Sequence, residues 1–387
     1  MDMSKFQKIR MDQFPLAEKC VYLDTATTGL FSRRGRDAMV GFIDARFENG
    51  MDIYMFNKTW EYADALRKTA AEVINADSDE IFFGDTGSGM LNVFSSGIPL
   101  QEHANVVVSG LSFPSTPYNW MNRVGEENVR IAEPEDGALP CEKIFELVDD
   151  NTAVIALCLV ENTSGWRHDI KTIGDFCKRE GVYLVLDITQ CIGAMNVDVK
   201  KTHVDFLVGT SYKWISGPFG AAVGYCSRRV LHKIHPTYVG WTGNKDRNNH
   251  SRYKLALMDA ACRFETGSLN WIGLKGIEQS MKLYLELGKQ DVEDYILGLT
   301  QYLYDRTHEL NAVKLVGPFL EKNRSGIVFL TFPEEWKLSD REVQEAGIRL
   351  HVATPSSMRV SLHYYNNRED VDKLIDYLKS LEKHPQG

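Results

Sequence analysis

Two residues with complementary chemistry lie near the ends of two apolar runs in the middle of this chain. Asp187 lies in VYLVLDITQ (182–190), and Lys213 follows 26 positions later in VDFLVGTSYKW (204–214). Both runs are short, rich in β-branched residues and followed by turn residues, which predicts buried parallel strands. Parallel strands of one sheet end at the same edge, so we expect a carboxylate and an amine to lie there together.

A carboxylate and an amine at one sheet edge are the pair that an aldehyde cofactor on a pyridine ring requires. Lys213 would form a Schiff base with the aldehyde, and Asp187 would keep the ring nitrogen protonated so that the ring can accept electrons. Taken singly, Asp187 could cap a following helix and Lys213 could be a solvated strand end. The motifs described below favour the cofactor site.

Composition indicates a folded protein without the charge pattern of a nucleic-acid or membrane binder. The 387 residues are 43% hydrophobic and 25% charged, which is typical of globular proteins. Lys plus Arg number 44 and Asp plus Glu number 53, so the formal net charge is −9. An acidic chain without a dense basic stretch is a poor candidate for nucleic acid or an anionic membrane. No apolar stretch approaches the length of a membrane span.

The cysteines argue for a reducing environment. There are seven, with no CxxC pair, at positions 20, 141, 158, 177, 191, 226 and 262. Several lie in apolar runs, which predicts reduced, mostly buried thiols rather than disulfides or a metal site. The N-terminal segment 1–16 lacks the apolar core of a signal peptide. We therefore expect a cytoplasmic protein.

Short apolar runs alternate with amphipathic stretches from about residue 80 to 230. This alternation predicts an α/β fold with a doubly wound, mostly parallel sheet. The predicted strands lie at 80–85, 105–110, 152–160, 182–187, 205–211 and 221–226. After about residue 265 the pattern changes to a long helical region, 274–308, followed by strand, helix, strand and helix. We expect a large domain over 21–265 and a smaller C-terminal α+β domain over 266–387.

A Gly-rich turn follows the first of these strands. In FFGDTGSGMLN (82–92), Gly87, Ser88 and Gly89 open a predicted helix. The backbone N–H groups at that helix start and the Ser88 hydroxyl can bind a phosphate. The segment lacks the lysine of a nucleotide P-loop and the GxGxxG spacing of a dinucleotide site, so a single phosphate monoester is the better ligand.

Other polar and aromatic side chains follow strands at the same predicted edge. Phe113 comes after the strand at 105–110 and could stack on a flat ring, or it is an ordinary buried aromatic. Gln190, three residues after Asp187, could donate to an oxygen on the ring. Asn162 follows the strand at 152–160 and could add a polar contact. Either amide could equally bond to its own loop backbone.

Arg359 lies inside a late apolar strand, MRVSLHYY (358–365). A buried arginine costs free energy unless an anion neutralises it. Its planar guanidinium suits bidentate capture of a substrate carboxylate. A structural ion pair with a neighbouring Asp or Glu is the alternative.

Six segments, in order, resemble the class V aminotransferase family of pyridoxal-phosphate enzymes over nearly the whole chain. They are YLDTATTGL (22–30), ENTSGWRHDI (161–170), LDITQCIGAMNVDV (186–199), DFLVGTSYKWISGPFG (205–220), FETGSLN (264–270) and RVSLHYYN (359–366). The resemblance implies the fold type I architecture and pyridoxal 5′-phosphate as cofactor. It also implies that an N-terminal segment, residues 1–20, packs against the small domain.

The resemblance implies roles for single residues at the ring and at the substrate. Lys213 would be the Schiff-base lysine and the proton carrier at the substrate α-carbon. Asp187 would pair with the pyridine nitrogen, and Gln190 would contact the phenolic oxygen of the ring. Arg359 would hold the substrate carboxylate, with Asn162 assisting.

Further residues are implied at the phosphate. Gly87, Ser88 and Gly89 would surround it, with added hydroxyls from Ser211 and Tyr212. Ser268, in FETGSLN, matches a position that reaches the phosphate of the neighbouring subunit. The resemblance therefore implies a homodimer with shared active sites.

The chain also departs from parts of this family. Cysteine desulfurases and selenocysteine lyases use a nucleophilic cysteine in the C-terminal domain, but the last cysteine here is Cys262. Sulfur transfer through a protein persulfide is therefore not expected. Phe113 stands where those enzymes stack a histidine, and its segment and Ser-Tyr-Lys are closer to kynureninase and isopenicillin N epimerase-like proteins. Trp241, in VGWTG (239–243), either lines the substrate pocket as the similarity to kynureninase suggests or packs in the core.

The expected activity is that of an aminotransferase acting on a small amino acid with a free α-carboxylate. Removal of the α-proton by Lys213 leaves other outcomes open, because the protein chooses which bond is aligned and where a proton returns. The alternatives are a lyase that eliminates or cleaves the side chain, and an epimerase. A non-catalytic regulator on the same fold is the alternative of another class.

Overall fold

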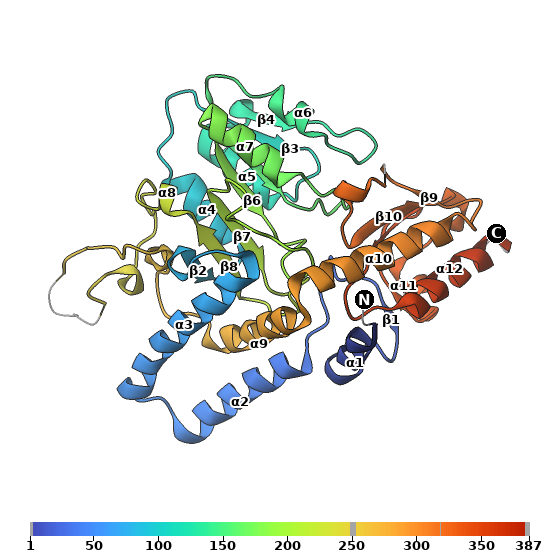
Figure 1. Ribbon diagram of the computed structural model, residues 1–387, viewed down its shortest axis with the longest axis horizontal. Helices are drawn as coiled ribbons and strands as arrows, with labels where there is room; N and C mark the ends of the chain where they lie inside the picture. The colour runs from blue at the N-terminus through green and yellow to red at the C-terminus, as the bar shows by residue number, and fades with distance from the viewer. Residues whose placement is uncertain (1–2, 248–252, 318, 384–387) are drawn as a thin grey trace.

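A seven-stranded sheet forms the centre of the larger part of the molecule (Figure 1). The computed structural model describes residues 3–247, 253–317 and 319–383. In spatial order the strands are β2 (Ile81–Gly84), β8 (Ala222–Cys226), β7 (Phe206–Thr210), β6 (Tyr183–Asp187), β5 (Thr152–Cys158), β3 (Asn105–Ser109) and β4 (Val129–Ala132). Strand β8 runs antiparallel to both neighbours, and the other adjoining pairs are parallel. The predicted mostly parallel sheet is confirmed.

Six of these strands coincide with predicted apolar runs, and β4 was not predicted. The reason is its place at the edge of the sheet, where only one neighbour covers it. Ile131 in β4 is 42% exposed, whereas the residues of β3 are all buried. A half-exposed edge strand lacks the continuous apolar run that marks a central parallel strand.

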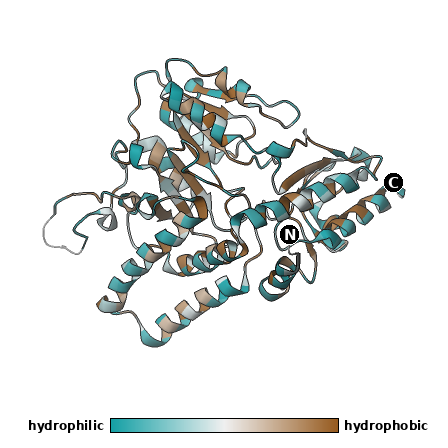
Figure 2. Cartoon of the chain, in the orientation of Figure 1, coloured by the Kyte–Doolittle hydropathy of each residue, from teal (hydrophilic) through white to brown (hydrophobic). Residues whose placement is uncertain are grey.

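Helices cover both faces of this sheet. Helices α4 (Gly87–Gly97) and α5 (Ser115–Val124) pack on one face, against Val106, Val154 and Val208. Helices α3 (Ile53–Ile74), α7 (Ile170–Glu180) and α9 (Trp271–Leu287) pack on the other. The strands are accordingly the most apolar part of this region (Figure 2). Burial on both faces is what makes consecutive residues of these strands hydrophobic.

The predicted helical region 274–308 is two helices rather than one. Helix α9 ends at Leu287 and α10 (Lys289–Thr307) begins after Gly288, whose φ is +85°. A residue with that φ ends a helix, and glycine adopts it without steric cost. The break lets α9 stay under the large sheet while α10 reaches the small one (Figure 1).

The smaller part is built on a four-stranded antiparallel sheet. Its spatial order is β12 (His351–Thr354), β13 (Ser357–Ser361), β10 (Ile327–Thr331) and β9 (Lys314–Leu315), and α12 (Arg368–Lys383) packs with α10 beside it. The remaining elements are α1 (Met3–Gln13), β1 (Val21–Tyr22), α2 (Arg33–Asn49), α6 (Cys141–Phe145), α8 (Arg228–Leu231), α11 (Asp340–Glu345), β11 (Ile348–Arg349) and six short 3-10 helices, η1 (Ser78–Glu80), η2 (Glu126–Asn128), η3 (Trp241–Gly243), η4 (Ala261–Phe264), η5 (Glu321–Asn323) and η6 (Glu334–Trp336).

The N-terminal residues contact the C-terminal part of the chain. Arg10 forms a buried ion pair with Asp370, and the ring of Phe6 stacks on Tyr295 at 4.0 Å. Strand β1 pairs in parallel with β11. Strand β1 belongs to the predicted large domain by its position in the chain, yet it lies on the smaller part of the molecule. The domain boundaries at 20 and 265 stay a prediction. Among the described residues, none of the helices combines the length and apolar character needed to cross a bilayer.

Candidate active site

A cavity of about 370 Å³ lies at the carboxyl ends of β5, β6 and β7, and both Asp187 and Lys213 line it. Asp187 is the last residue of β6, and Lys213 lies in the turn after β7, the adjacent strand. The sheet thus brings together the two side chains on which the cofactor hypothesis depends. Their meeting at one edge follows from the parallel pairing of β6 with β7.

Burial shifts both groups toward their neutral forms. Lys213 is 8% exposed, and burial lowers the pKa of its amine although the nearby Asp187 opposes that shift. Asp187 is 7% exposed, and burial raises the pKa of its carboxyl against two bonds from Thr189. A neutral amine can act as a nucleophile or proton acceptor. A buried carboxylate without a cation is stabilised when a cation binds beside it.

Helix α4 begins at the wall of the cavity. Its N-cap Thr86 accepts a hydrogen bond from the Gly89 N–H (3.1 Å). The N–H groups of Gly87 and Ser88 have no partner in the described structure, and both residues line the cavity. A Cβ on Gly87 would lie 2.9 Å from Cγ2 of Thr210, so glycine allows this helix start to approach β7 closely. Free N–H groups at a helix start are suited to a phosphate.

Aromatic rings border the same space. The Nζ of Lys213 lies 5.5 Å from the ring centroid of Phe113 and 5.7 Å from that of Tyr212. Phe113 is 47% exposed, so it is not the buried core aromatic of the alternative interpretation. Tyr212 in turn stacks on Phe219, with ring centroids 4.5 Å apart. A flat ligand in this cavity would have an aromatic wall.

Two residues implied by the resemblance are already engaged elsewhere. Gln190 lines the cavity, but its Nε2 donates to the Ala26 carbonyl (3.1 Å) and its Oε1 accepts from Trp214 Nε1 (2.7 Å). One N–H of its amide is left for a ligand. Ser211 is fully buried and does not line the cavity; its hydroxyl donates to the Pro218 carbonyl and closes the turn after β7.

Arg359 is buried on β13, next to the cavity but not in its wall. Its Nη2 donates to Thr27 Oγ1 (2.5 Å) and lies 3.5 Å from Asp24 Oδ1. Its Nη1 donates to the backbone carbonyl of Asn162 (3.4 Å). The charge of Arg359 helps lower the pKa of the Lys213 amine, so the two groups are close. Asp24 and Thr27 were not predicted as site residues, although both lie in YLDTATTGL (22–30).

Asn162 contributes to the site through its backbone. Its side-chain Oδ1 is buried and lacks a hydrogen-bond partner among the residues that the structure describes. An amide oxygen left in that state is stabilised if a ligand donates to it. The assisting role that the resemblance implies for Asn162 stays a prediction.

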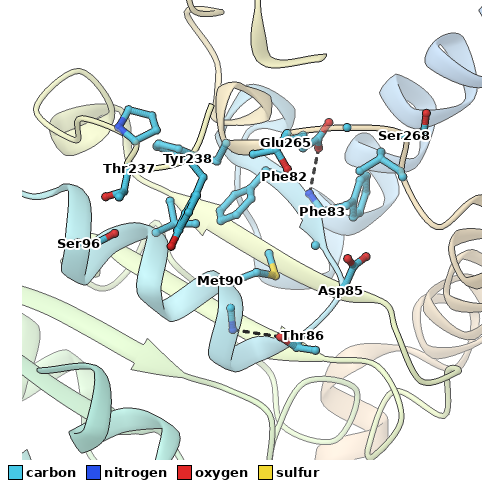
Figure 3. A pocket seen from close by; sticks show the side chains of 18 residues that line it. Phe82, Phe83, Asp85, Thr86, Met90, Ser96, Thr237, Tyr238, Glu265 and Ser268 are labelled. Atoms are coloured by element: carbon cyan, nitrogen blue, oxygen red, sulfur yellow. Dashed lines mark hydrogen bonds between the residues drawn. The ribbon is translucent and has the colours of Figure 1, made fainter. Parts of the chain in front are cut away.

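Ser268 lines a second cavity, of about 290 Å³, beside the start of α4 (Figure 3). Asp85 and Thr86 line both cavities, and Gly89 faces only the second. Glu265, in the same segment as Ser268, accepts a hydrogen bond from the Phe83 N–H (3.0 Å), which ties this segment to β2. Within one chain, Ser268 and Lys213 therefore belong to different cavities.

Trp241 does not line the Lys213 cavity either. It lies in η3 and packs edge-on against Trp60 of α3 at 5.6 Å, with Phe56 stacked on it at 6.3 Å. In the single chain this is the packing alternative that the sequence left open. Its side chain is still 40% exposed.

Further residues of the Lys213 cavity were not predicted. They include Asp85, Thr86, Ser115, Cys158, Val160, Thr189, Thr210, Phe219 and Gly220. Cys158 ends β5 and is the register partner of Asp187, so its place at the end of a predicted strand was the available signal. Burial raises the pKa of its thiol well above the usual range.

Comparison with known proteins identifies the family. A match to Aminotransferase class-V covers residues 21–374. The chain belongs to the class V aminotransferase family. A probable cysteine desulfurase of Methanothermobacter thermautotrophicus is 26% identical over 97% of this chain and 98% of its own. A kynureninase of Bacillus cereus is 24% identical over 96% of this chain and 90% of its own.

Two solved structures share the fold of this chain. The apo cysteine desulfurase of Thermococcus onnurineus NA1 superposes with a TM-score of 0.83 at 24% identity, over 97% of this chain and 98% of that one. The cystine C–S lyase C-DES, solved with its product cysteine persulfide, superposes with a TM-score of 0.86 at 20% identity, over 95% and 99%. The type I fold predicted from the sequence is confirmed.

Pyridoxal 5′-phosphate is the cofactor of this class V enzyme, and the residues of the cavity fit it. Asp187 forms no ion pair in the described structure, although the Lys213 charge acts on it from a longer distance, so a protonated ring nitrogen would supply a counter-ion. The free N–H groups of Gly87 and Ser88 suit the phosphate, and Lys213 offers the amine. Phe113 offers a ring face. These are the partners that an aldehyde on a phosphorylated pyridine needs.

Proposed function

We propose that this enzyme is a lyase that breaks a bond at the β-carbon of an α-amino acid, rather than an aminotransferase. The names of its relatives, cysteine desulfurase and kynureninase, both describe removal of a side chain or part of one. The observation that carries the proposal is this similarity to two kinds of side-chain-cleaving enzyme. The Lys213 cavity adds an argument against sulfur transfer onto the protein. It holds the amine of Lys213 and the buried Asp187 but offers no reactive thiol.

Pyridoxal phosphate, when bound, supplies an aldehyde that condenses with amines and a ring that stabilises negative charge at the substrate α-carbon. The chain supplies the remaining requirements. Asp187 stabilises a protonated ring nitrogen, and the start of α4 holds the phosphate. Lys213, with its pKa lowered by burial, is able to accept the α-proton as a neutral amine and to return it.

The substrate carboxylate is held by Arg359 in this proposal. The guanidinium is 7% exposed, and Asp24 lies at 3.5 Å. Because five N–H groups project from a guanidinium, donors remain after the bonds to Thr27 and Asn162. Burial strengthens a charge-assisted hydrogen bond to a carboxylate.

The state of Cys158 separates this proposal from sulfur transfer onto the protein. In the described structure it is the one thiol that lines the cavity, and burial keeps it protonated. A protonated thiol is a poor nucleophile. A sulfur substituent would therefore depart as a small-molecule thiol, sulfide or persulfide, and no persulfide would form on the enzyme.

Product analysis without an added acceptor tests the proposal. The holoenzyme is incubated with L-cysteine, L-cystine, O-acetyl-L-serine or L-kynurenine in the absence of any α-keto acid, and pyruvate, ammonia, alanine and sulfide are measured. Release of pyruvate and ammonia, or of alanine, at catalytic rates supports the lyase. Amino-group exchange that depends on a keto acid would establish the aminotransferase, and inversion alone would establish an epimerase. A chain that takes up no cofactor would overturn the proposal.

A homodimer with shared active sites is part of the proposal. Ser268 lies outside the Lys213 cavity of its own chain, and large apolar side chains stand exposed near both cavities, with Phe219 at 67% and Tyr238 at 77%. Exposed aromatic residues beside a site are typical of surfaces covered by a partner. Light scattering coupled to gel filtration should give twice the mass of one chain. A monomer that retains full activity would contradict the shared site.

A further inference from the structure

The segment from Asp24 to Gly29 lies between Arg359 and Lys213. The proposed reaction requires these two side chains to keep a fixed position relative to each other. Residues Val21 and Tyr22 form β1, which pairs with β11 in a separate two-stranded sheet, and the chain then crosses to the turn after β7. Each half of the segment is bonded to a different part of the molecule. Its position in the middle makes it a structural link between the substrate arginine and the catalytic lysine.

The first half is attached to the strand that carries Arg359. The Ser361 N–H donates to the Leu23 carbonyl (2.8 Å), and Asp24 forms an isolated parallel bridge with Ser361. Thr25 shares a hydrogen bond of 2.5 Å with the Tyr365 hydroxyl. Because Ser361 is two residues from Arg359 on β13, these bonds place Asp24 beside the guanidinium.

The second half is attached to the cofactor side. The Gln190 amide donates to the Ala26 carbonyl (3.1 Å). The Gly29 N–H donates to the Tyr212 carbonyl (2.9 Å), one residue before Lys213. Thr27 lies between these two bonds, so its backbone is held from both sides. A hydroxyl on such a backbone has a defined position toward Arg359.

The guanidinium of Arg359 needs a partner that fixes its orientation. Its guanidinium is buried, and its Nε has no hydrogen-bond partner in the described part of the chain. Asp24 supplies negative charge with its Oδ1 3.5 Å from Nη2, at the outer limit of a hydrogen bond, so it directs the guanidinium only weakly. The Thr27 hydroxyl accepts from Nη2 at 2.5 Å, so it fixes the rotation of the guanidinium plane.

We propose that Thr27 is a positioning residue that orients Arg359 for the carboxylate of the substrate. The inference rests on the proposed function, in which Arg359 binds that carboxylate. Asp24 balances the charge of Arg359 while Thr27 selects its orientation. Without the hydroxyl, the guanidinium would have to be ordered when the substrate binds, which weakens binding. Steps at Lys213 would be unaffected, because Thr27 does not bond to it.

Thr27→Val in the holoenzyme tests this role, since valine keeps the shape and removes the hydroxyl. Thr27 is exposed, so the change removes no core contact. Glycine and methylamine serve as probes, because both condense with the cofactor aldehyde but only glycine carries a carboxylate. Binding is followed by the change in cofactor absorbance. The expected result is a roughly tenfold weaker glycine affinity, the size typical of losing a hydrogen bond to a charged group, with unchanged methylamine affinity.

Three comparisons sharpen the result. Thr27→Ser should restore the glycine affinity, because it restores the hydroxyl. Thr28→Val is a matched control at the next threonine, whose hydroxyl has no bond in the described structure, and it should change neither affinity. With a turned-over substrate, Thr27→Val should raise KM and leave kcat unchanged. These outcomes together separate orientation of Arg359 from a general effect on the fold.

Two results would overturn the inference alone. One is a glycine affinity of Thr27→Val within twofold of the unaltered enzyme. The other is an equal loss of glycine and methylamine affinity, which would show a general disturbance of the site. If the unaltered holoenzyme bound methylamine but not glycine, the carboxylate role of Arg359 would fail and the inference with it. If it bound neither, the proposed function itself would fail.

Discussion

A methyl group at Gly29 would lie 1.9 Å from the carbonyl oxygen of Lys213. The two residues are 184 positions apart in the chain, yet the backbone of one packs directly on the other. The Gly29 N–H also donates to the Tyr212 carbonyl at 2.9 Å. The turn that presents the catalytic amine is therefore shaped by a glycine from the N-terminal part of the chain.

Gly29→Ala should displace the Lys213 turn, because backbone atoms rather than a flexible side chain oppose the new methyl group. We expect a loss of about 100-fold in kcat/KM, as for other displacements of about 1 Å at a reacting group. The free energy of unfolding should fall by about 1–3 kcal/mol. Steady-state kinetics and urea denaturation measure the two effects.

Gly41→Ala is the control for this substitution. Gly41 lies in helix α2, and no atom lies within 4 Å of the added Cβ. It should keep full activity and gain about 0.5–1 kcal/mol of stability from helix propensity. Equal activity of the two alanine variants would show that the close approach at Gly29 does not position Lys213.

Asp187→Asn should reduce turnover by about 100-fold or more, because an amide does not stabilise a protonated ring nitrogen as a carboxylate does. The substitution preserves the shape of the side chain and its contacts with Thr189. The absorbance spectrum of the bound cofactor and kcat are the measurements. Borohydride should fix the cofactor to a peptide containing Lys213 in both proteins, and absence of such a peptide would contradict the site itself.

His363 should make the fold sensitive to mild acid. It is fully buried, and its Nε2 lies 2.7 Å from the carbonyl oxygen of Trp214, which marks Nε2 as the protonated nitrogen. Burial lowers the pKa of His363 from 6.5 to about 3. Below pH 6.5 the unfolded chain therefore binds a proton that the folded chain does not. Its stabilising contribution is complete above that pH and is lost as the pH falls toward 3, by about 1.4 kcal/mol per pH unit.

Urea denaturation at pH 7 and pH 5 measures this effect. Between those values the unaltered protein should lose about 2 kcal/mol more than His363→Gln, because glutamine does not titrate. The comparison between the two proteins removes the contribution of all other groups. The same pH dependence in both proteins would exclude His363 as its source.

The buried ion pair between Arg67 and Glu265 should be important for stability. Both Glu265 oxygens accept from Arg67 Nη2, at 2.8 and 2.6 Å, and the side chains are 5% and 1% exposed. Glu265→Gln leaves a buried guanidinium with less compensation, so we expect a loss of about 3 kcal/mol on urea denaturation. Asp175→Asn removes the exposed pair with Lys171 and should leave the unfolding curve unchanged. Equal curves for the two variants would contradict this expectation.

The positions of Asp187 and Lys213 were predictable from the sequence. Asp187 ends a short, continuously apolar run, and Lys213 follows the end of another by three residues. Such runs form central parallel strands because both faces are buried. Parallel pairing of two such strands then brings their carboxyl ends together without further information. The start of α4 at Gly87 was predictable for a similar local reason, since a glycine-rich turn there links a strand to a helix.

The surroundings of Arg359 were decided by the tertiary structure. Its partner Thr27 lies 332 positions away, and neither residue has a local pattern that indicates the other. The side chains of Gln190 and Ser211 likewise donate hydrogen bonds to the Ala26 and Pro218 carbonyls. Their positions after strands did not predict these bonds.

Local periodicity is set by which face of a strand or helix is buried, so it specifies the strands and where each ends. Local periodicity does not indicate which distant segment of the chain packs beside the site. The amine and carboxylate of the site were therefore determined by the sequence pattern alone. The packing of residues 24–29 between Arg359 and Lys213 exists only once the whole chain has folded, because its bonds join three separate regions.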